Sequence, residues 1–375
     1  MRNKIKVIDS IRAGAGKFSK KDVHLHSGVS WGAMYKIVEN LLASKVISQG
    51  SEKPVGRGRP NIPLQLDPDA AYFAGLDIGS SYTKIVFCDL DFKLRHQEKA
   101  ATPTYSGETA FFDWLKNLYR NALANSELNA AKISGLCIAV SGTVDSEAGV
   151  IVSGANWGLA PGAKLDVTCL SERLSCPVCV YSTQVAAVQA EYLFGEKAGC
   201  GNLVSIGLGV GIGSGAIANH VLLISHPKRP VGYIGHLLIP DNDRDCVCGW
   251  HGCLEAFSGG NSLTKIARSK LDGVNSAKDI DTLAASGNKT AKKIMDTAAK
   301  YNAVGIAGMI QLYSPEAVIF AGGQSRLDGY LFKQTVTELQ KLLPADRRDC
   351  VIGITALGEY QAALGAARLA YENFF

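Results

Sequence analysis

The chain has 375 residues, which is too long for one small core and fits two or three domains. Hydrophobic residues make up 47% of the composition and charged residues 19%, so the chain is globular. The sequence contains no run of about 18 apolar residues, which a membrane span would require. The formal net charge of +5 is uneven, because residues 1–60 hold twelve Lys and Arg against four Asp and Glu, a local charge of +8 on a body of −3.

The first residues do not have the pattern of a targeting signal. Met1-Arg2-Asn3-Lys4 leads into an amphipathic segment where a secretory signal would have an apolar core, so we expect a cytoplasmic protein without a membrane partner. A basic segment on a slightly acidic body indicates that the N-terminal segment binds a polyanion.

Residues 1–45 carry the pattern of three short helices. A helix is predicted over residues 4–12, Ser19-Lys20-Lys21-Asp22 resembles a capping box that starts the second helix, and a third begins near Ser30 with apolar residues at helical spacing. Three short helices with a glycine in the turn are typical of a helix-turn-helix, whose recognition helix enters the major groove of DNA. We expect the side chains off its apolar stripe to contact DNA, namely Ser30, Trp31, Tyr35 and Lys36.

A hairpin is predicted after the third helix. Residues 46–66 suggest a two-stranded wing around Gly56-Arg57-Gly58-Arg59-Pro60, and arginines in an extended strip suit the narrow minor groove and its phosphates. Arg57 and Arg59 are therefore predicted DNA contacts. The alternative for this region is a small helical dimerisation module with a solvated basic face. We favour a winged helix-turn-helix domain over residues 1–62, followed by a linker over 63–72.

Two glycine-rich hairpins mark the rest of the chain. The first joins strands at 74–78 and 84–90 through Gly79-Ser80-Ser81-Tyr82-Thr83, and the second spans residues 203–217 with five glycines at alternate positions. Such turns can hold a phosphate on backbone amides. The Gly-x-x-x-x-Gly-Lys-Ser/Thr pattern of a P-loop is absent from the sequence, and neither hairpin clearly opens a helix as a dinucleotide site requires. Two such hairpins predict a duplicated, actin-like ATPase fold with a cleft between lobes.

A metal site is predicted from one histidine and three of the ten cysteines. His236 is followed by Cys246, Cys248 and Cys253 in a short, glycine-rich stretch. One imidazole and three thiolates form the ligand set of a closed, structural zinc site. The alternative is a group of ordinary reduced thiols beside a surface histidine. We expect zinc as the cofactor.

The same stretch carries a resemblance to a known family. Gly235-His236, a gap of nine residues and the run from Cys246 to Glu255, Cys-Val-Cys-Gly-Trp-His-Gly-Cys-Leu-Glu, resemble the signature of the ROK family of bacterial sugar kinases and sugar-responsive repressors. The resemblance covers nearly the whole chain. The Gly-Arg-Gly-Arg-Pro strip also resembles the segment that follows the winged helix in ROK repressors, whereas family kinases lack the N-terminal domain.

This resemblance implies a fold and a set of ligand-binding residues. The fold is α/β, an actin-like (ribonuclease H-like) duplicated sugar-kinase fold with a first lobe over residues 73–184 plus 356–375 and a second lobe with the zinc site over 185–355. The side chains that the resemblance assigns to the sugar pocket are Asn156, His236 and Glu255. The alternative for Asn156 is a simple turn residue.

The chain departs from the family kinases where they carry out chemistry. Kinases have Asn-Asp-Ala before the helix predicted at 185–195, and the Asp takes the proton from the sugar hydroxyl. This chain has Ser182-Thr183-Gln184 there, and a threonine hydroxyl is no base at neutral pH. Loss of a general base typically lowers the rate about 10² to 10⁴-fold. Further departures are Tyr233 in place of a sugar-binding carboxylate, Val210 in place of a phosphate-facing threonine, and Ser80 in place of a glycine.

The sequence therefore predicts a sugar-responsive, DNA-binding repressor of carbohydrate metabolism genes whose kinase-like body is not an enzyme. Its expected partners are operator DNA and a small sugar or sugar phosphate. We expect a homodimer or homotetramer, because half-sites lie about 34 Å apart or a multiple of it. Two alternatives stay open. One is an ATP-dependent sugar kinase with an altered catalytic base, and the other is a body whose pocket is filled by Tyr233 and which binds another protein.

Overall fold

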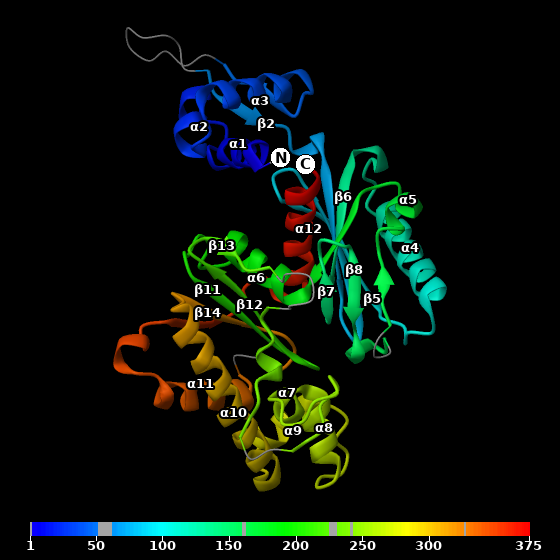
Figure 1. The fold of residues 1–375 in the computed structure, drawn as a ribbon, viewed down its shortest axis with the longest axis vertical. Helices are drawn as coiled ribbons and strands as arrows, with labels where there is room; N and C mark the ends of the chain where they lie inside the picture. Colours follow the sequence, from blue (N-terminus) through cyan, green and yellow to red (C-terminus); the bar gives the residue numbers. More distant parts are fainter. Residues whose placement is uncertain (1, 52–61, 160–162, 225–230, 241–242, 326–327) are drawn as a thin grey trace.

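A computed structural model describes residues 2–51, 62–159, 163–224, 231–240, 243–325 and 328–375. Figure 1 shows a small N-terminal domain that sits on one end of a two-lobed body, with both chain termini at the junction. The expected DNA contacts Arg57 and Arg59 lie outside the described residues. Within the described parts of the chain, none of the helices combines the length and the apolar character that a membrane crossing requires.

The N-terminal domain consists of three helices and a two-stranded sheet. Its elements are α1 (Arg2–Ala13), α2 (Lys20–Ser27), α3 (Trp31–Ala43), β1 (Ile47–Gln49) and β2 (Leu64–Leu66). The predicted capping box starts α2, since the Ser19 N–H donates to the Asp22 carboxylate at 2.9 Å. Gly28 ends the helix with a φ of 64°, a left-handed conformation that favours glycine.

The linker predicted over residues 63–72 differs from the structure. Leu64–Leu66 pairs antiparallel with β1, and the fully buried Leu64 belongs to the apolar core of the N-terminal domain. A 3-10 turn, η1 (Pro68–Ala70), then leads directly into the first strand of the body. The apolar side chain of Leu64 gains more from burial beside the helices than from an exposed linker position, so the connection is short.

The first lobe is built on a five-stranded sheet in the order β10-β6-β3-β4-β5. Its elements in chain order are β3 (Tyr72–Ile78), β4 (Tyr82–Asp89), β5 (Leu94–Ala101), α4 (Glu108–Asn125), η2 (Ala130–Lys132), β6 (Ile133–Val140), η3 (Ala155–Trp157), α5 (Leu170–Leu174), β10 (Val178–Ser182) and α6 (Thr183–Phe194). A small second sheet holds β7 (Thr143–Asp145), β8 (Val150–Ser153) and β9 (Leu165–Asp166).

The second lobe repeats this plan with the order β13-β12-β11-β14-β15. Its elements are β11 (Leu203–Leu208), β12 (Ile212–Ala218), β13 (Val221–Leu222), η4 (Ile234–His236), α7 (Glu255–Ser258), α8 (Gly260–Arg268), α9 (Ala277–Ala285), α10 (Lys289–Tyr313), β14 (Ala317–Ala321), α11 (Tyr330–Leu342), η5 (Ala345–Arg347) and β15 (Val351–Ile354). The chain then returns to the first lobe through η6 (Gly358–Tyr360) and α12 (Gln361–Phe374), and α12 packs on β3 and β6.

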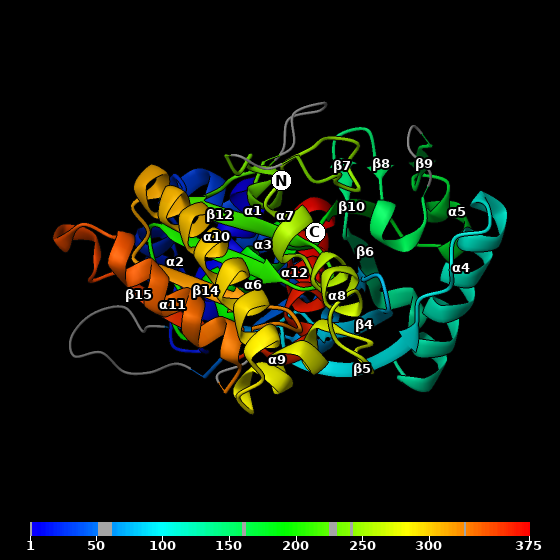
Figure 2. The same ribbon diagram turned by 90° about the horizontal axis from the view of Figure 1, so that it is seen from below.

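The two sheets have the same pairing. In each, three consecutive strands run antiparallel and two later strands add in parallel, which confirms the predicted duplicated α/β fold. Figure 2 shows α4 and α5 on the outer side of the first sheet and α10 and α11 on the outer side of the second.

The last helix of each half, α6 and α12, packs between the two sheets. Their contact is close because Gly365 has no side chain, and a Cβ at this position would overlap the carbonyl oxygen of Ala186. Gly75 of β3 admits the backbone of α12 in the same way. The backbones of α6, which begins at Thr183, and α12, which ends beneath the N-terminal domain, are therefore in contact.

Candidate functional site

The four predicted metal ligands converge in the second lobe. All four ligand atoms of His236, Cys246, Cys248 and Cys253 lie within 4.8 Å of one another. His236 Nδ1 is 3.7 Å from Cys246 Sγ, and the Sγ atoms of Cys248 and Cys253 are also 3.7 Å apart. The edge of a tetrahedron with zinc–sulfur distances near 2.3 Å is about 3.8 Å, so this donor set and spacing fit a tetrahedral zinc ion.

The backbone of the loop brings these ligands together. Isolated β-bridges join Leu238 to Cys253 and Asp245 to His251, so the chain folds back on itself between the histidine and the last cysteine. Gly249 and Gly252 have φ values of 88° and 75°, which glycine adopts without steric cost. The group could hold a metal ion with no position left open for a water or substrate.

Glu255 and Asn156, both assigned to the sugar pocket by the resemblance, form a pair across the two lobes. Glu255 is the first residue of α7 in the second lobe, and Asn156 lies in η3 of the first. The Glu255 carboxylate accepts the Ile212 N–H at 2.6 Å, and the Asn156 amide group lies near enough to favour its ionised form. Burial raises the pKa of Glu255, and these two donors oppose the shift.

A second contact across the lobes involves Tyr233, the residue that stands in place of a family carboxylate. Its hydroxyl and that of Thr143 in β7 are hydrogen-bonded. The Tyr233 ring packs on the His236 ring, with centroids 5.4 Å apart and an interplanar angle of 34°. The sequence singled out Tyr233, but its contact with Thr143, which lies 90 positions earlier, has no local pattern that predicts it.

The position that corresponds to the kinase base is occupied by a hydrogen-bond donor. Thr183 Oγ1 donates to the Asp77 carboxylate at 2.9 Å, at the N-terminus of α6. Asp77 is buried, and burial raises its pKa, whereas Lys84 and Thr183 act in the opposite direction. Among the residues 182–184 that begin α6, no carboxylate is available to accept a sugar proton.

The loop after β14 contacts the tip of the β11–β12 hairpin. The side chain of Gln324, in the loop after β14, donates to the Gly209 carbonyl at 2.5 Å and so bridges this loop to the tip of the β11–β12 hairpin. The cavity beside Gly323 and Gln324 has a volume of about 10 Å³. This is roughly the space of one water molecule.

The four expected DNA contacts of the described region lie together on the exposed side of α3. Ser30, Trp31, Tyr35 and Lys36 are all exposed, and the aromatic residues retain 48% and 44% of their accessible surface. Lys20 of α2 lies beside this group, with its ammonium group 4.5 Å from the Tyr35 ring centre and paired with Glu39 at 2.5 Å.

The chain is similar in sequence both to a known repressor and to a known sugar kinase. A xylose repressor of Caldicellulosiruptor bescii is 23% identical over 345 residues, which cover 88% of this chain and 85% of the repressor. A glucokinase of Halalkalibacterium halodurans is 24% identical over 318 residues, which cover 80% of this chain and 96% of the kinase.

A solved structure extends this likeness to the N-terminal domain. It is described as a ROK family transcriptional regulator, a homolog of the E. coli MLC protein, and it superimposes with a TM-score of 0.78 at 22% identity. The match covers 98% of this chain and 96% of that one. The family model described as "ROK family" matches residues 73–373, both lobes of the body. On this evidence of sequence and fold, the chain belongs to the ROK family.

Proposed function

We propose that this protein is a sugar-responsive, DNA-binding transcriptional repressor whose body does not phosphorylate sugar. The observation that carries the proposal is the hydrogen bond from Thr183 to Asp77, because it puts a hydroxyl where family kinases have the catalytic base. The similarity to a protein named as a xylose repressor, and to a ROK regulator structure over 98% of the chain, favours the same reading.

The N-terminal domain supplies DNA binding in this proposal. Trp31 and Tyr35 present aromatic faces at the exposed N-terminal half of α3, and Lys36 adds a charge beside them. Ser30 precedes the helix, and Arg57 and Arg59 would reach the minor groove from the hairpin. An exposed first turn of a recognition helix is the part that contacts base edges in helix-turn-helix proteins.

Replacement of two neighbouring residues tests this assignment. Operator DNA is first selected from a random library with the full chain. Lys36→Ala is expected to weaken binding and to relax the sequence preference at the base pair that Lys36 faces. Tyr35→Ala is expected to change the preferred sequence at one or two positions.

Lys292→Ala is the control, since Lys292 lies on α10 in the second lobe. If Lys36→Ala and Tyr35→Ala both select and bind the same DNA as the natural chain, α3 is not the recognition helix.

In this proposal the body contains the ligand site and the metal-binding site. His236, Cys246, Cys248 and Cys253 would hold one zinc ion as a structural centre, and this would fix the histidine ring beside Tyr233. Asn156 and Glu255, with the outer side of His236, would bind the hydroxyls of a small sugar or sugar phosphate. A homodimer or homotetramer would present two N-terminal domains to two half-sites.

The second candidate function is a sugar kinase with an altered base, favoured by the similarity to a glucokinase over 80% of the chain. Incubation with ATP, magnesium and a panel of hexoses distinguishes the two. The repressor proposal expects no sugar phosphate above background, and turnover at ordinary kinase rates, about 1 per second or faster, would overturn it.

A further inference from the structure

The Tyr233 side chain is aimed by a rigid part of the second lobe. Gly232 before it has a φ of 83°, and a Cβ there would overlap the carbonyl oxygen of Ser214 in β12. The Ser214 N–H donates to the Gly232 carbonyl at 2.8 Å and the Ser214 hydroxyl donates to it at 3.0 Å. The backbone at Tyr233 is therefore fixed to the sheet, and its phenol is directed at the first lobe.

The hydroxyl group of Tyr233 completes a short chain of hydroxyls. Ser153 Oγ donates to Thr143 Oγ1 at 3.0 Å, and Thr143 Oγ1 is bonded to the Tyr233 hydroxyl. Ser153 Oγ also accepts the Thr143 N–H at 3.3 Å, which holds the threonine in place within the β7–β8 hairpin. Thr143, the partner of the phenol, is thus held in position by the first lobe itself.

The phenol ring lies among the residues proposed to bind ligand. One side of it packs on His236, and the negative charge of Glu255 lies close enough to raise the pKa of Tyr233 further, beyond the larger effect of burial. Glu255 is itself joined to Asn156 of the first lobe, in a space that exists because Gly211 has no side chain. A Cβ there would lie 2.6 Å from the Glu255 carboxylate and 2.8 Å from the Asn156 amide nitrogen.

We propose that Tyr233 is a built-in occupant of the ligand cleft, which holds the two lobes together through Thr143 in place of a ligand hydroxyl. The inference rests on the proposed sugar site and specifies its regulation: a small polyhydroxy ligand must displace the phenol from Thr143 before it can bridge the lobes. The apparent affinity for such a ligand is lowered by the fraction of molecules that are already closed on the phenol.

Removal of either hydroxyl tests the contact without any ligand. Tyr233→Phe and Thr143→Val each leave the shape of the side chain nearly unchanged. A net hydrogen bond of ordinary strength corresponds to a factor of about three to ten in an opening equilibrium. We expect hydrogen exchange at the amides of the β7–β8 hairpin to speed up about three- to tenfold in each variant.

The double variant and a matched control complete this test. The double variant is expected to exchange no faster than Thr143→Val alone, because Thr143→Val already removes the hydrogen bond to Tyr233 together with the one from Ser153. Tyr192→Phe is the control, since its hydroxyl bonds only to the exposed His220 side chain at 3.2 Å in the described structure. Unchanged exchange in Tyr233→Phe, or single effects that simply add in the double variant, would overturn the proposal.

Calorimetric titration with D-glucose, D-xylose and N-acetyl-D-glucosamine separates this contact from the proposed function. We expect Tyr233→Phe to bind at least one of these sugars about three- to tenfold more tightly than the natural chain. Tighter binding by the natural chain would overturn the displacement model, because the phenol would then be a ligand contact. If no variant binds any sugar while the exchange effect is present, the lobe contact is supported and the sugar response is contradicted.

Discussion

Arg368→Met is expected to loosen the N-terminal domain from the body and to lower the free energy of unfolding by about 2–3 kcal/mol. Arg368 of α12 binds Asp9 of α1 with both terminal nitrogens, at 2.9 and 2.6 Å, and its Nε donates to Glu372 at 2.8 Å. The arginine side chain is 7% exposed, so its loss leaves a partly buried carboxylate without its main partner. We place the cost below that of a fully buried pair because the Asp9 side chain is 32% exposed.

The surroundings of this pair explain why it fixes the domain. Asp9 also accepts hydrogen bonds from Arg12 and from the Tyr371 hydroxyl. Arg12 in turn donates to the Leu90 carbonyl of the body at 2.7 Å. Both arginines lie over the rings of Phe92 and Tyr371, at 4.7 to 5.1 Å. One apolar cluster also runs without a break from the core of the N-terminal domain into α12 and β3. The N-terminal domain is therefore packed on the body and not merely tethered to it.

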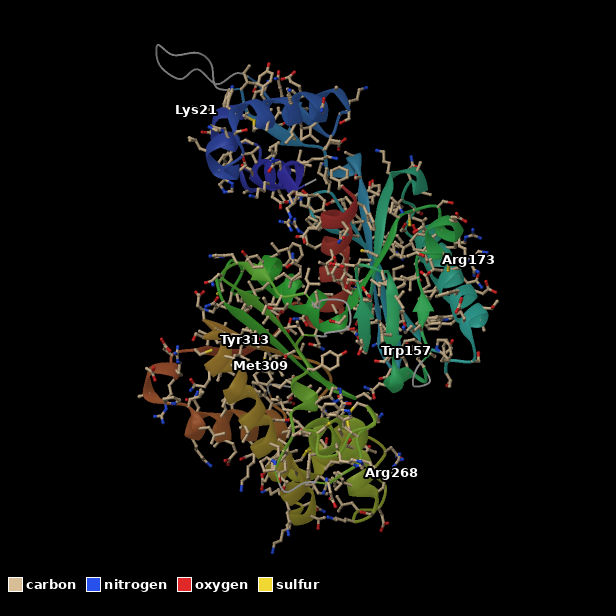
Figure 3. The ribbon with its side chains drawn as sticks, viewed as in Figure 1. Lys21, Trp157, Arg173, Arg268, Met309 and Tyr313 are labelled. Atoms are coloured by element: carbon tan, nitrogen blue, oxygen red, sulfur yellow. The ribbon has the colours of Figure 1, made fainter. Side chains whose placement is uncertain are left out.

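Thermal and chemical unfolding measure the change in the free energy of unfolding, and the affinity for selected operator DNA tests whether the N-terminal domain is loosened. Arg173→Met is the matched control, because Arg173 is 40% exposed, lies 3.8 Å from Asp113 on the outer side of the first lobe, and is far from the junction (Figure 3). A surface pair of this kind contributes about 0–1 kcal/mol. Equal effects of the two substitutions would show that the Asp9 contact carries no special weight.

The contribution of Asp9 depends on pH in a defined direction. Burial alone raises the pKa of Asp9, but hydrogen bonds and charges from Arg368 and Arg12 outweigh it and hold the pKa below its usual 3.8. A lowered pKa means that the stabilisation is fully present above about pH 4 and is lost as the pH falls through the folded value. The difference between the natural chain and Arg368→Met is expected to be constant from pH 6 to 8 and to shrink as the pH falls into the range where Asp9 takes up a proton in the variant.

Cys253→Ser is expected to abolish metal binding and to lower the midpoint of thermal unfolding by about 5–10 °C. Cys253 is fully buried, and its Sγ lies within the 4.8 Å group, so a serine removes one of four ligands and leaves the others in mutual repulsion if they stay ionised. Structural zinc contributes its binding energy to folding, and a loss of about 3 kcal/mol shifts the midpoint by this amount in a chain with lobes of this size.

Elemental analysis of protein purified without chelators measures the zinc content per chain, and calorimetry measures the midpoint of thermal unfolding. About one zinc per chain is expected in the natural protein and none in the variant. Cys169→Ser is the control, since Cys169 is exposed and lies outside the cluster. A chain that never contains zinc, or a Cys253→Ser variant with full metal content, would contradict the predicted centre.

Local sequence patterns were enough to predict the main helices and hairpins and, within the candidate site, the proposed metal ligands. Apolar residues at helical spacing fixed α3, and glycine-rich turns located both hairpins within a few residues of β3–β4 and β11–β12. The proposed metal ligands were predictable because they lie within 18 positions of one another, where residue type and spacing alone define a coordination chemistry. The place of Thr183 followed from comparison with a family motif in the same local way.

Only the tertiary structure decided which distant segments meet. Thr143 and Tyr233 are 90 residues apart and Asp9 and Arg368 are 359 apart, and neither pair has a pattern of its own in the sequence. The same holds for Gln324 at the Gly209 carbonyl and for Leu64, which joined the sheet of the N-terminal domain where a linker was expected. A helix or a metal-binding loop is specified by residues that are neighbours along the chain. Contacts between lobes depend instead on how whole sheets and helices pack, because that packing is set by the sum of many apolar contacts.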